Sequence, residues 1–508
     1  MRSFTRTNTL RTIVAALSLA VLPLIGGCML GPNYKRPQLD VPVGWRDQAP
    51  EPGQDAAAVP ASLANTPWWE LFRDPELQDV IRIALAENQD LLIAVERIVE
   101  ARARLGFVRA DLFPKIDLNT NVSRFAQSRE GFPNNPSPAP NDAMLYGLSL
   151  DVLWEIDLFG RIRRSTEAER ALLLATEEGR RAVAISLVAS VASTYVDLRS
   201  ADLRLEIARR TLASRARSLD LTRARFSGGL TSEKDPQQAE AEYRRVEVTV
   251  FQLEQLVRAT ENALSVLIGR NPGPIVRGSA LPDLPVAFAV PAGLPSDLLD
   301  RRPDLRAAEE QLHATTADIG AAKALLFPRI ALTAGYGTAS TEFDALFMGS
   351  SQAWSVAAGL VQPIFNAGKN IRRVQIAESQ MRQTLYAYER SVLQAFREVE
   401  DSLNAWEHTS AARGSEHKRV TAERRVVQLA TARYEGGVAD YLEVLDAQRS
   451  LFSAELDEVD TIGAQLNSLI QLYKALGGGW PVEPESVATA DSEPKKACHW
   501  TGHPRAGN

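Results

Sequence analysis

The chain has 508 residues, of which 24% are charged and 45% are hydrophobic, and its 57 basic and 63 acidic residues give a formal net charge of -6. This acidic balance argues against a nucleic-acid partner, because a DNA- or RNA-binding surface needs an excess of lysine and arginine.

The amino terminus has the form of a signal peptide over residues 1–27. Three arginines within the first eleven residues precede an apolar run from Ile13 to Ile25, which is too short to span a bilayer as a helix. Its end, Ile25-Gly26-Gly27-Cys28, resembles a bacterial lipoprotein signal. That resemblance implies cleavage before Cys28, with a diacylglycerol thioether and an amide-linked acyl chain on this residue. An ordinary secretory signal with a chance cysteine is the alternative.

Cleavage removes three arginines, which changes the net charge to about -9 (-6 minus 3). The only other cysteine is Cys498, so with Cys28 acylated the mature chain has no internal disulfide and its fold depends on packing. In lipoproteins of this kind, a residue other than aspartate after the cysteine directs the protein to the outer membrane. Here that residue is Met29.

Residues 28–73 are rich in proline and alanine and predict an extended segment that lies on a surface. Asp74 and Pro75 then suit the N-cap and the first position of a helix, which we expect to continue to about Asp111.

Four segments of about ten residues alternate between apolar and polar side chains and predict strands at 115–126, 145–157, 329–339 and 353–363. Leu153 is the one exception to the alternation in the second strand. Between the first two strands, residues 127–142 contain four prolines and predict a loop. Each strand has the length needed to cross a bilayer at a tilt.

Long helices follow each pair of strands, in hairpins predicted at 161–268 and 369–476. Apolar residues recur every seven positions in the first helix, which predicts coiled-coil packing and a rod of roughly 100 Å; the recurring residues are Val191, Leu198, Leu205, Leu212, Leu219 and Phe226. Gly228-Gly229 ends this rod, and Gly436-Gly437 ends its counterpart.

The chain is one structural unit written twice. Leu112-Phe113-Pro114-Lys115-Ile116 matches Leu326-Phe327-Pro328-Arg329-Ile330 at a spacing of 214, and the segment from Ala224 to Leu230 matches that from Ala432 to Val438 at a spacing of 208. We therefore expect repeats at 74–270 and 297–476, a proline-rich linker at 271–296 and a polar tail at 477–508.

Four strands cannot close a barrel, and open sheet edges are not tolerated in hydrocarbon. Two copies of the chain would pool eight strands around an interior nearly filled by side chains, whereas three copies would pool twelve around a wide lumen. A soluble sandwich is the alternative, and it has to explain Trp154 and Trp354 on the apolar faces.

The chain resembles the TolC-like outer membrane factors, in the lipoprotein (NodT-type) branch that serves RND-type tripartite efflux systems. The match spans about residues 28 to 480 and is carried by Cys28 with Gly31-Pro32-Asn33-Tyr34, Trp68-Trp69-Glu70-Leu71-Phe72, Leu298-Leu299-Asp300-Arg301-Arg302-Pro303-Asp304, the two Phe-Pro copies, Ala432-Arg433-Tyr434 to Ala447-Gln448-Arg449, and Tyr473-Lys474-Ala475-Leu476-Gly477.

This resemblance implies an α+β membrane protein: a homotrimer with a twelve-stranded outer-membrane β-barrel that continues into a long periplasmic α-helical barrel. It implies a passive exit duct for drugs or other small toxic molecules, and hence a part in antibiotic resistance. The implied partners are a periplasmic adaptor, an inner-membrane RND-type transporter and outer-membrane lipids, with no cofactor beyond the lipid on Cys28. The alternatives are the duct of a type I protein secretion system and a lipid-anchored coiled-coil scaffold without a pore.

The resemblance also selects site residues at the two hairpin turns. It implies adaptor contact at Gly229, Leu230, Thr231, Gly437, Val438 and Ala439, and a periplasmic gate built from Asp440, Glu435 and Glu443 with Arg225 and Arg433 as pairing partners. The glycines have a purely structural alternative, since they permit a tight turn. Ala439 departs from relatives that often carry an acid there, which leaves the position of the acidic ring open.

No catalytic function is expected. Glu310 and His313 have the helical spacing of a metal-ligand pair, but the counterpart of His313 in the first repeat is Val99 and no second such pair exists, so no metal site is predicted.

Overall fold

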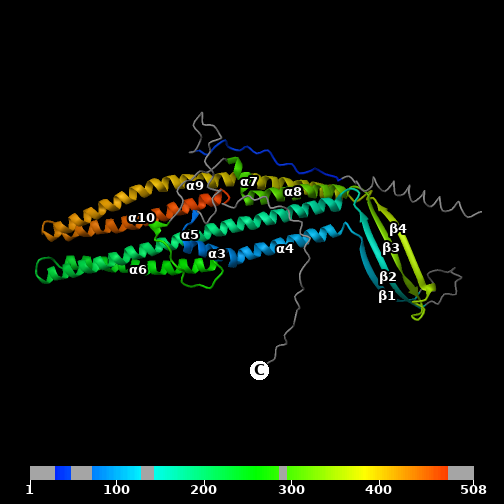
Figure 1. Cartoon of the computed structure of the whole chain (residues 1–508), viewed down its shortest axis with the longest axis horizontal. Helices are drawn as coiled ribbons and strands as arrows, with labels where there is room; N and C mark the ends of the chain where they lie inside the picture. Colours follow the sequence, from blue (N-terminus) through cyan, green and yellow to red (C-terminus); the bar gives the residue numbers. More distant parts are fainter. Residues whose placement is uncertain (1–28, 47–70, 127–141, 285–294, 479–508) are drawn as a thin grey trace, which may run out of the picture.

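The computed structural model describes residues 29–46, 71–126, 142–284 and 295–478. The expected signal peptide, Cys28, the loop from 127 to 141 and Cys498 lie outside the described residues. The described chain is long and narrow, with four strands at one end and two helical hairpin turns at the other (Figure 1).

The strands form one antiparallel sheet in the order β1-β2-β3-β4. Their bounds are β1 Lys115–Ala126, β2 Asp142–Ile156, β3 Arg329–Ser340 and β4 Gln352–Val361. The second strand therefore begins three residues before the expected position 145, and the fourth ends at 361 instead of 363. Antiparallel pairing joins the two halves of the chain directly, because β2 lies beside β3.

The two faces of the sheet differ in polarity, as the alternation predicts. One face carries large apolar side chains that are exposed in the single chain, among them Leu118, Trp354 and Val356, which are 68%, 77% and 74% exposed. On the other face the Asp151 carboxylate accepts hydrogen bonds from Asn119 at 2.7 Å and Ser149 at 2.9 Å. Leu153 shares this polar face and is 52% exposed.

Two long helical hairpins extend from the sheet: α5 Arg161–Ser227 with α6 Lys234–Leu267, and α9 Lys369–Glu435 with α10 Tyr441–Ala475. On α5 the heptad residues Val191, Leu198, Leu205 and Leu219 are buried, whereas Phe226 is 44% exposed. By length and composition, α5 is the one described helix that could cross a bilayer, but 56% of its apolar window is buried within the chain. This helix is therefore the centre of the packing.

The helix expected between Asp74 and Asp111 is in fact two helices, α3 Pro75–Glu87 and α4 Gln89–Ala110. The chain turns at Asn88, where ψ is 128° and the backbone leaves the helical region. Asn88 Oδ1 accepts from Leu91 N at 3.1 Å, which caps α4, and Nδ2 donates to Leu267 O at 2.9 Å. The interruption went unpredicted because it occurs within a continuous apolar pattern, at an asparagine rather than at a proline.

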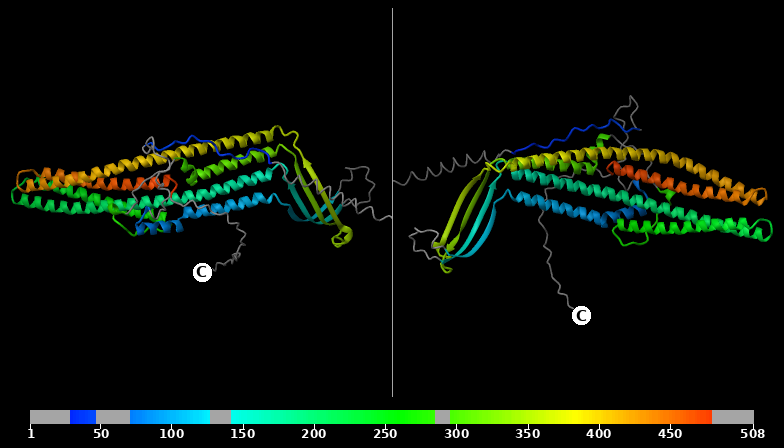
Figure 2. Two further views of the ribbon diagram at one scale, coloured as in Figure 1. Left: turned by 45° about the horizontal axis from the view of Figure 1, so that its top comes forward. Right: turned by 180° about the vertical axis from the view of Figure 1, so that it is seen from behind.

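In the second half the corresponding region contains α7 Leu298–Arg301 and α8 Pro303–Ala324. Three short 3₁₀ turns complete the described structure: η4 Leu281–Asp283, η5 Pro295–Asp297 and η6 Gly349–Ser351. Near the sheet the helices lie side by side in the order α4-α5-α8-α9, and towards the turns α6 and α10 take the places of α4 and α8 (Figure 2).

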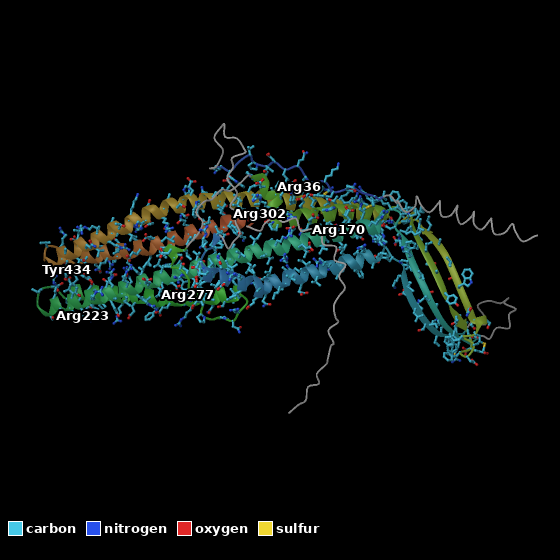
Figure 3. All side chains as sticks on the ribbon, viewed as in Figure 1. Arg36, Arg170, Arg223, Arg277, Arg302 and Tyr434 are labelled. Carbon is cyan, nitrogen blue, oxygen red and sulfur yellow. The ribbon has the colours of Figure 1, made fainter. Side chains whose placement is uncertain are left out.

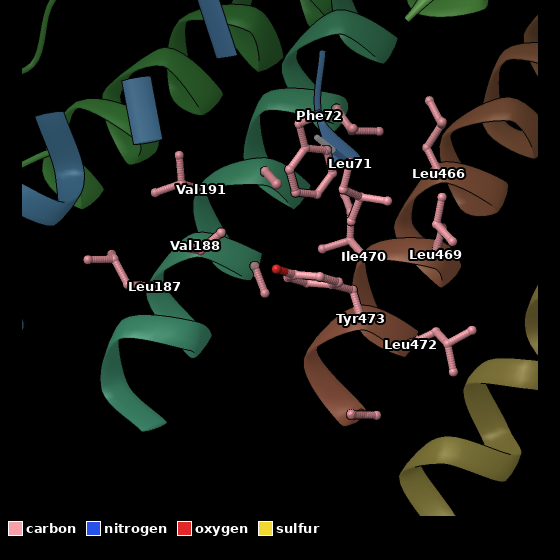
Figure 4. Packing of buried hydrophobic residues seen from close by; sticks show 14 of the residues in the cluster. Leu71, Phe72, Leu187, Val188, Val191, Leu466, Leu469, Ile470, Leu472 and Tyr473 are labelled. Carbon is pink, nitrogen blue, oxygen red and sulfur yellow. The ribbon is translucent and has the colours of Figure 1, made fainter. Parts of the chain in front are cut away.

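The largest hydrophobic cluster lies midway along the helices, where Leu71 and Phe72 enter between α5 and α10 (Figure 4). Phe72 meets Tyr473 edge-on with ring centroids 6.5 Å apart. Arg302 ties the start of α8 to the same region, donating to Ala475 O at 2.9 Å and to Glu398 at 2.8 Å. The belt of packing thus joins both halves at their middle.

Residues 29–46, which we call the strap, run without helix or strand along α8 and α9. At the sheet end, Arg164 donates to Leu30 O at 2.9 Å, and a side chain at position 31 would collide with the backbone of Gly320. Farther along, Tyr34 stacks on His313 with ring centroids 4.9 Å apart. At the far end Trp45 is buried against Phe396.

Glu310 and His313 help to hold the strap against the helices. His313 lies 3.3 Å from Glu310 and 3.4 Å from Glu167 while it stacks on Tyr34. Among the described residues, no group of three or more histidine, cysteine, aspartate or glutamate side chains is arranged to hold a metal ion.

Candidate functional site: the two hairpin turns

The first hairpin turn closes with backbone hydrogen bonds, and Ser227 Oγ also donates to Ala224 O at 2.9 Å. Gly228 N donates to Ala224 O at 3.0 Å, Gly229 N to Phe226 O at 2.9 Å and Leu230 N to Arg225 O at 2.9 Å. Gly229 has φ +70°, a left-handed conformation that glycine adopts without strain. Satisfying the last carbonyls of α5 in this way reverses the chain within a few residues.

The second turn repeats this geometry. Gly436 N donates to Ala432 O, Gly437 N to Tyr434 O and Val438 N to Arg433 O, each at 3.0 Å, and Gly437 has φ +74°. Leu230 and Val438 are 75% and 71% exposed at the corresponding points of the two turns. Both turns therefore expose a large apolar side chain at the same point.

No chain atom lies within 4 Å of where a Cβ would stand on Gly229 or Gly437. Both turn glycines thus present open surface in the single chain, and Thr231 and Ala439 beside them are half-buried. The two turns, which contain the six residues expected to contact an adaptor, lie at the same end of the molecule, near the labelled Arg223 and Tyr434 (Figure 3).

Arg225 connects the two turns. Its Nη1 donates to Tyr434 O at 3.2 Å and its Nη2 to Glu435 O at 3.4 Å, so the cation meets the negative end of α9. Its guanidinium carbon also lies 4.5 Å from the centroid of the Tyr434 ring. The expected carboxylate partner is therefore replaced by backbone carbonyls and an aromatic face.

Arg433 pairs within its own hairpin, with its Nε 3.0 Å from Glu443 Oε1. Both side chains are about half exposed, at 56% and 46%, so this pair contributes little to stability. Asp440 is exposed at the N-cap of α10 and makes no side-chain capping bond. Its carboxylate is thus available at the end of the second hairpin.

Asp235 belongs to this charged group although the sequence analysis did not select it. The residue is buried in the first turn of α6. Burial raises the pKa of the Asp235 carboxyl above its ordinary value, and the nearby Asp440 carboxylate raises this pKa further. The sequence signal was Asp235-Pro236, the same pair that begins α3 at Asp74-Pro75.

A ladder of polar contacts joins α5 to α10 above the turns. The contacts are Asp197 with Asn467 at 2.9 Å, Arg204 with Asp460 at 3.2 Å, Arg210 with Glu455 at 2.9 Å, and Arg215 with Gln448. Arg215 is 2% exposed, and burial lowers the pKa of its guanidinium. Beside it, Arg449 Nε donates to the buried Glu242 at 2.9 Å, which links α10 to α6.

The position of one hairpin relative to the other therefore depends on contacts between polar side chains. A buried charge that loses its partner is costly, whereas water can replace the partner of an exposed one. Arg225 is only half-buried, so its contacts at the tip are easier to break than those of the buried Arg215 and Glu242 farther from it.

Comparison with known proteins gives one consistent result. A model of the outer membrane efflux protein family matches residues 80–270 and 294–478. The chain is 38% identical over 478 residues to the solvent efflux pump outer membrane protein SrpC of Pseudomonas putida, covering 92% of this chain and 98% of that one. It is 35% identical over 475 residues to the outer membrane protein OprJ of Pseudomonas aeruginosa, covering 92% and 96%.

Solved structures agree with these relatives. The outer-membrane channel OprN superimposes with a TM-score of 0.81 at 31% identity, covering 89% of this chain and all (100%) of that one. The open state of the MtrE outer membrane channel of Neisseria gonorrhoeae superimposes with a TM-score of 0.79 at 32% identity, covering 89% and 98%.

Replacing Arg225 with alanine removes the contacts that join the end of α5 to the end of α9. Hydrogen bonds to a charged donor contribute about 1.5–3 kcal/mol, so we expect amide exchange around residues 432–440 to rise about tenfold or more. Hydrogen–deuterium exchange of the purified protein measures this effect. Arg223→Ala is the matched control, because Arg223 pairs with Glu240 inside the first hairpin; equal exchange in the two variants would contradict the bridging role.

Proposed function

Because the chain belongs to the outer membrane efflux protein family, we propose that three copies of it enclose a continuous duct through the outer membrane and the periplasm. The observation that carries this proposal is a four-stranded sheet with an exposed apolar face at one end of helices 67 residues long. At 1.5 Å per residue such helices reach about 100 Å. One chain thus supplies both a membrane segment and a periplasmic segment.

The sheet supports closure by several copies. Its outward apolar side chains suit hydrocarbon, but the outer edges of β1 and β4 have no strand partner in the described chain. Unpaired backbone groups are not tolerated in lipid, so the edges must pair with other copies. Twelve strands leave room for a lumen, which the polar face with Asn119 and Asp151 would line.

Small molecules are the proposed cargo, which moves passively outward. Named relatives include solvent, toluene and antibiotic efflux pump proteins of Pseudomonas putida, and this supports the same substrate class for the present chain. A periplasmic adaptor and an inner-membrane RND-type transporter complete the pump and supply the energy. The chain itself needs no cofactor for this role.

A lipid on Cys28 would attach the chain to the same membrane. Met29, the next residue, packs on Gly160 at the start of α5, only four residues after β2 ends at Ile156. Consecutive Cα atoms are 3.8 Å apart, which supports a lipid anchor beside the periplasmic rim of the barrel. Cys28→Ala should abolish incorporation of labelled palmitate, whereas the control variant Cys498→Ser, which keeps Cys28, should still incorporate it. Label retained in Cys28→Ala would disprove the anchor.

The two turns are the proposed contact with the adaptor, through Gly229, Leu230, Thr231, Gly437, Val438 and Ala439. Open space at both glycines and the protruding Leu230 and Val438 support a surface that another protein covers. Replacing both glycines with tryptophan should reduce site-specific cross-linking to the adaptor at least tenfold. Gly414→Trp, at another open position in the middle of α9, is the control, and undiminished cross-linking in the turn variant would refute the contact.

The closed state of the proposed gate is held at the charged turns. Asp440, Glu435 and Glu443 would concentrate negative charge around the mouth. Arg225 would hold the two hairpin ends together, and Arg433 would pair with Glu443 within the second hairpin. Carboxylates around a pore favour cations, so the duct should be cation-selective in its resting state.

Conductance in planar bilayers tests the duct and its gate together. We expect trimers in detergent, wide pores with cation preference, and a larger resting conductance with a smaller preference in Asp440→Ala. Trimers without pores would favour a non-conducting scaffold. The protein could form pores while a strain that lacks its gene loses secretion of a substrate protein but keeps its resistance to solvents and antibiotics; this result would favour a type I secretion duct. If the pores of Asp440→Ala are unchanged, Asp440 is not part of the gate.

A further inference from the structure

The connection between β3 and β4, residues 341–351, exposes large apolar side chains at the end of the sheet farthest from the helices (Figure 1). We call this segment the outer loop. Phe343, Phe347 and Met348 are 63%, 69% and 57% exposed. Three such side chains gathered in one short segment indicate a surface that something else covers.

The outer loop is held in one shape by its own hydrogen bonds. Leu346 N donates to Phe343 O at 3.2 Å, and Met348 N donates to Ala345 O at 3.1 Å. The Ser351 hydroxyl also donates to Ala345 O, at 2.7 Å. Leu346 is buried, so the loop has a packed side as well as an exposed one. Because the segment is already ordered, covering its exposed side chains costs little further backbone entropy.

The outer loop leans over the apolar face of the sheet. Phe343 meets Tyr146 edge-on, with ring centroids 5.5 Å apart and an interplanar angle of 68°. Tyr146 occupies an even position of β2, as Leu150 does, and the even positions carry the apolar face. The polar face with Asn119 and Asp151 lies on the other side of the sheet. The loop therefore contacts the face that the proposed duct turns towards lipid.

Tyr146 marks the level at which the apolar face ends. Ten residues separate it from Ile156, the last residue of β2 (156 minus 146). At about 3.4 Å per residue and a tilt of about 40°, this stretch spans about 26 Å of bilayer, close to the apolar band of about 25 Å on outer-membrane barrels. Beyond Tyr146 the even positions become polar, because Arg124 Nε donates to Asp142 Oδ1 at 2.9 Å. Phe343 thus lies at the boundary between the apolar band and charged side chains.

Building on the duct proposed above, we propose that the outer loop lies on the membrane and inserts Phe343, Phe347 and Met348 into its outer leaflet, between the headgroups and the acyl chains. Aromatic side chains are favourable at this boundary, and burial of apolar surface stabilises the insertion. The acidic side chains of the same loop, Glu342 and Asp344, are exposed and remain in the hydrated headgroup layer. The loop is then a second membrane contact, separate from the strands.

A neighbouring copy does not offer the same cover. In the proposed trimer the copies meet at the outer edges of β1 and β4, whereas Phe343 lies against β2, an inner strand of the sheet. A loop folded over the lumen is the other arrangement, and it would require contacts with the polar face instead of with Tyr146. The observed contact therefore favours lipid as the occupant and leaves the exit of the duct uncovered.

Spin labels on single cysteines test the insertion in proteoliposomes, in a Cys498→Ser background whose own spectrum serves as the blank. Oxygen enters hydrocarbon, whereas a water-soluble nickel chelate is excluded from it. The ratio of oxygen to nickel accessibility should be about tenfold higher at Phe347→Cys than at Gly414→Cys, the open position in α9. Met348→Cys serves if Phe347→Cys does not form trimers, and it must show the same preference for oxygen.

A label at Val356→Cys separates this proposal from the duct itself, because Val356 lies on the apolar face of β4. Oxygen preference at Val356 with nickel preference at Phe347 would overturn the insertion of the loop alone. Nickel preference at both positions would overturn the membrane-embedded sheet as well.

Conductance of a variant with serine at positions 343, 347 and 348 tests the arrangement in a second way. We expect trimers whose pores conduct as the parent does, because an outer loop that lies on lipid stays clear of the lumen. A larger conductance in this variant would show that the loop covers the exit of the duct, and would overturn the proposal.

Discussion

The unpaired backbone along the two outer edges of the sheet is the constraint on which the rest of the molecule depends. Every buried N–H and C=O group needs a partner, and hydrocarbon offers none. A sheet whose apolar face is exposed and whose edges are open therefore has no stable existence in lipid as a single copy. The pairing of β2 with β3 satisfies this requirement once within the chain.

The helical part is built around one long central helix, α5. The helix α5 contacts α4 and α8 near the sheet, and α6 and α10 towards the turns. Its apolar residues Val188, Val191 and Tyr195 are buried at the belt, whereas Arg215 near the tip is buried with polar partners. Hydrophobic packing is thus most extensive at the belt. The belt is stabilised mainly by hydrophobic burial, whereas the ends of the two hairpins are joined by the half-buried contacts of Arg225.

Much of the architecture could be predicted from the sequence, because its two periodicities are strong and each occurs twice. Strand positions differ from the structure by at most three residues, and both turns have the left-handed glycines expected from their Gly-Gly pairs. The break at Asn88 was not predicted because the apolar pattern continues through it, and the burial of Asp235 was not predicted because it depends on packing between distant parts of the chain. The resemblance pointed to Arg225 and Arg433, but only three-dimensional contacts assign Arg225 to backbone carbonyls and Arg433 to Glu443. The local sequence pattern predicts whether a segment is a helix, a strand or a turn. Contacts between distant residues determine which side chains pair.

The helices α5 and α9 each contain 67 residues and start 208 positions apart, from glycines with φ of +77° and +78°. The two helices therefore extend equally far from the sheet end of the molecule. An insertion in only one of these helices would place its hairpin turn farther from the sheet than the other turn. A change in the length of one helix would therefore need a matching change in the other to keep the two turns level.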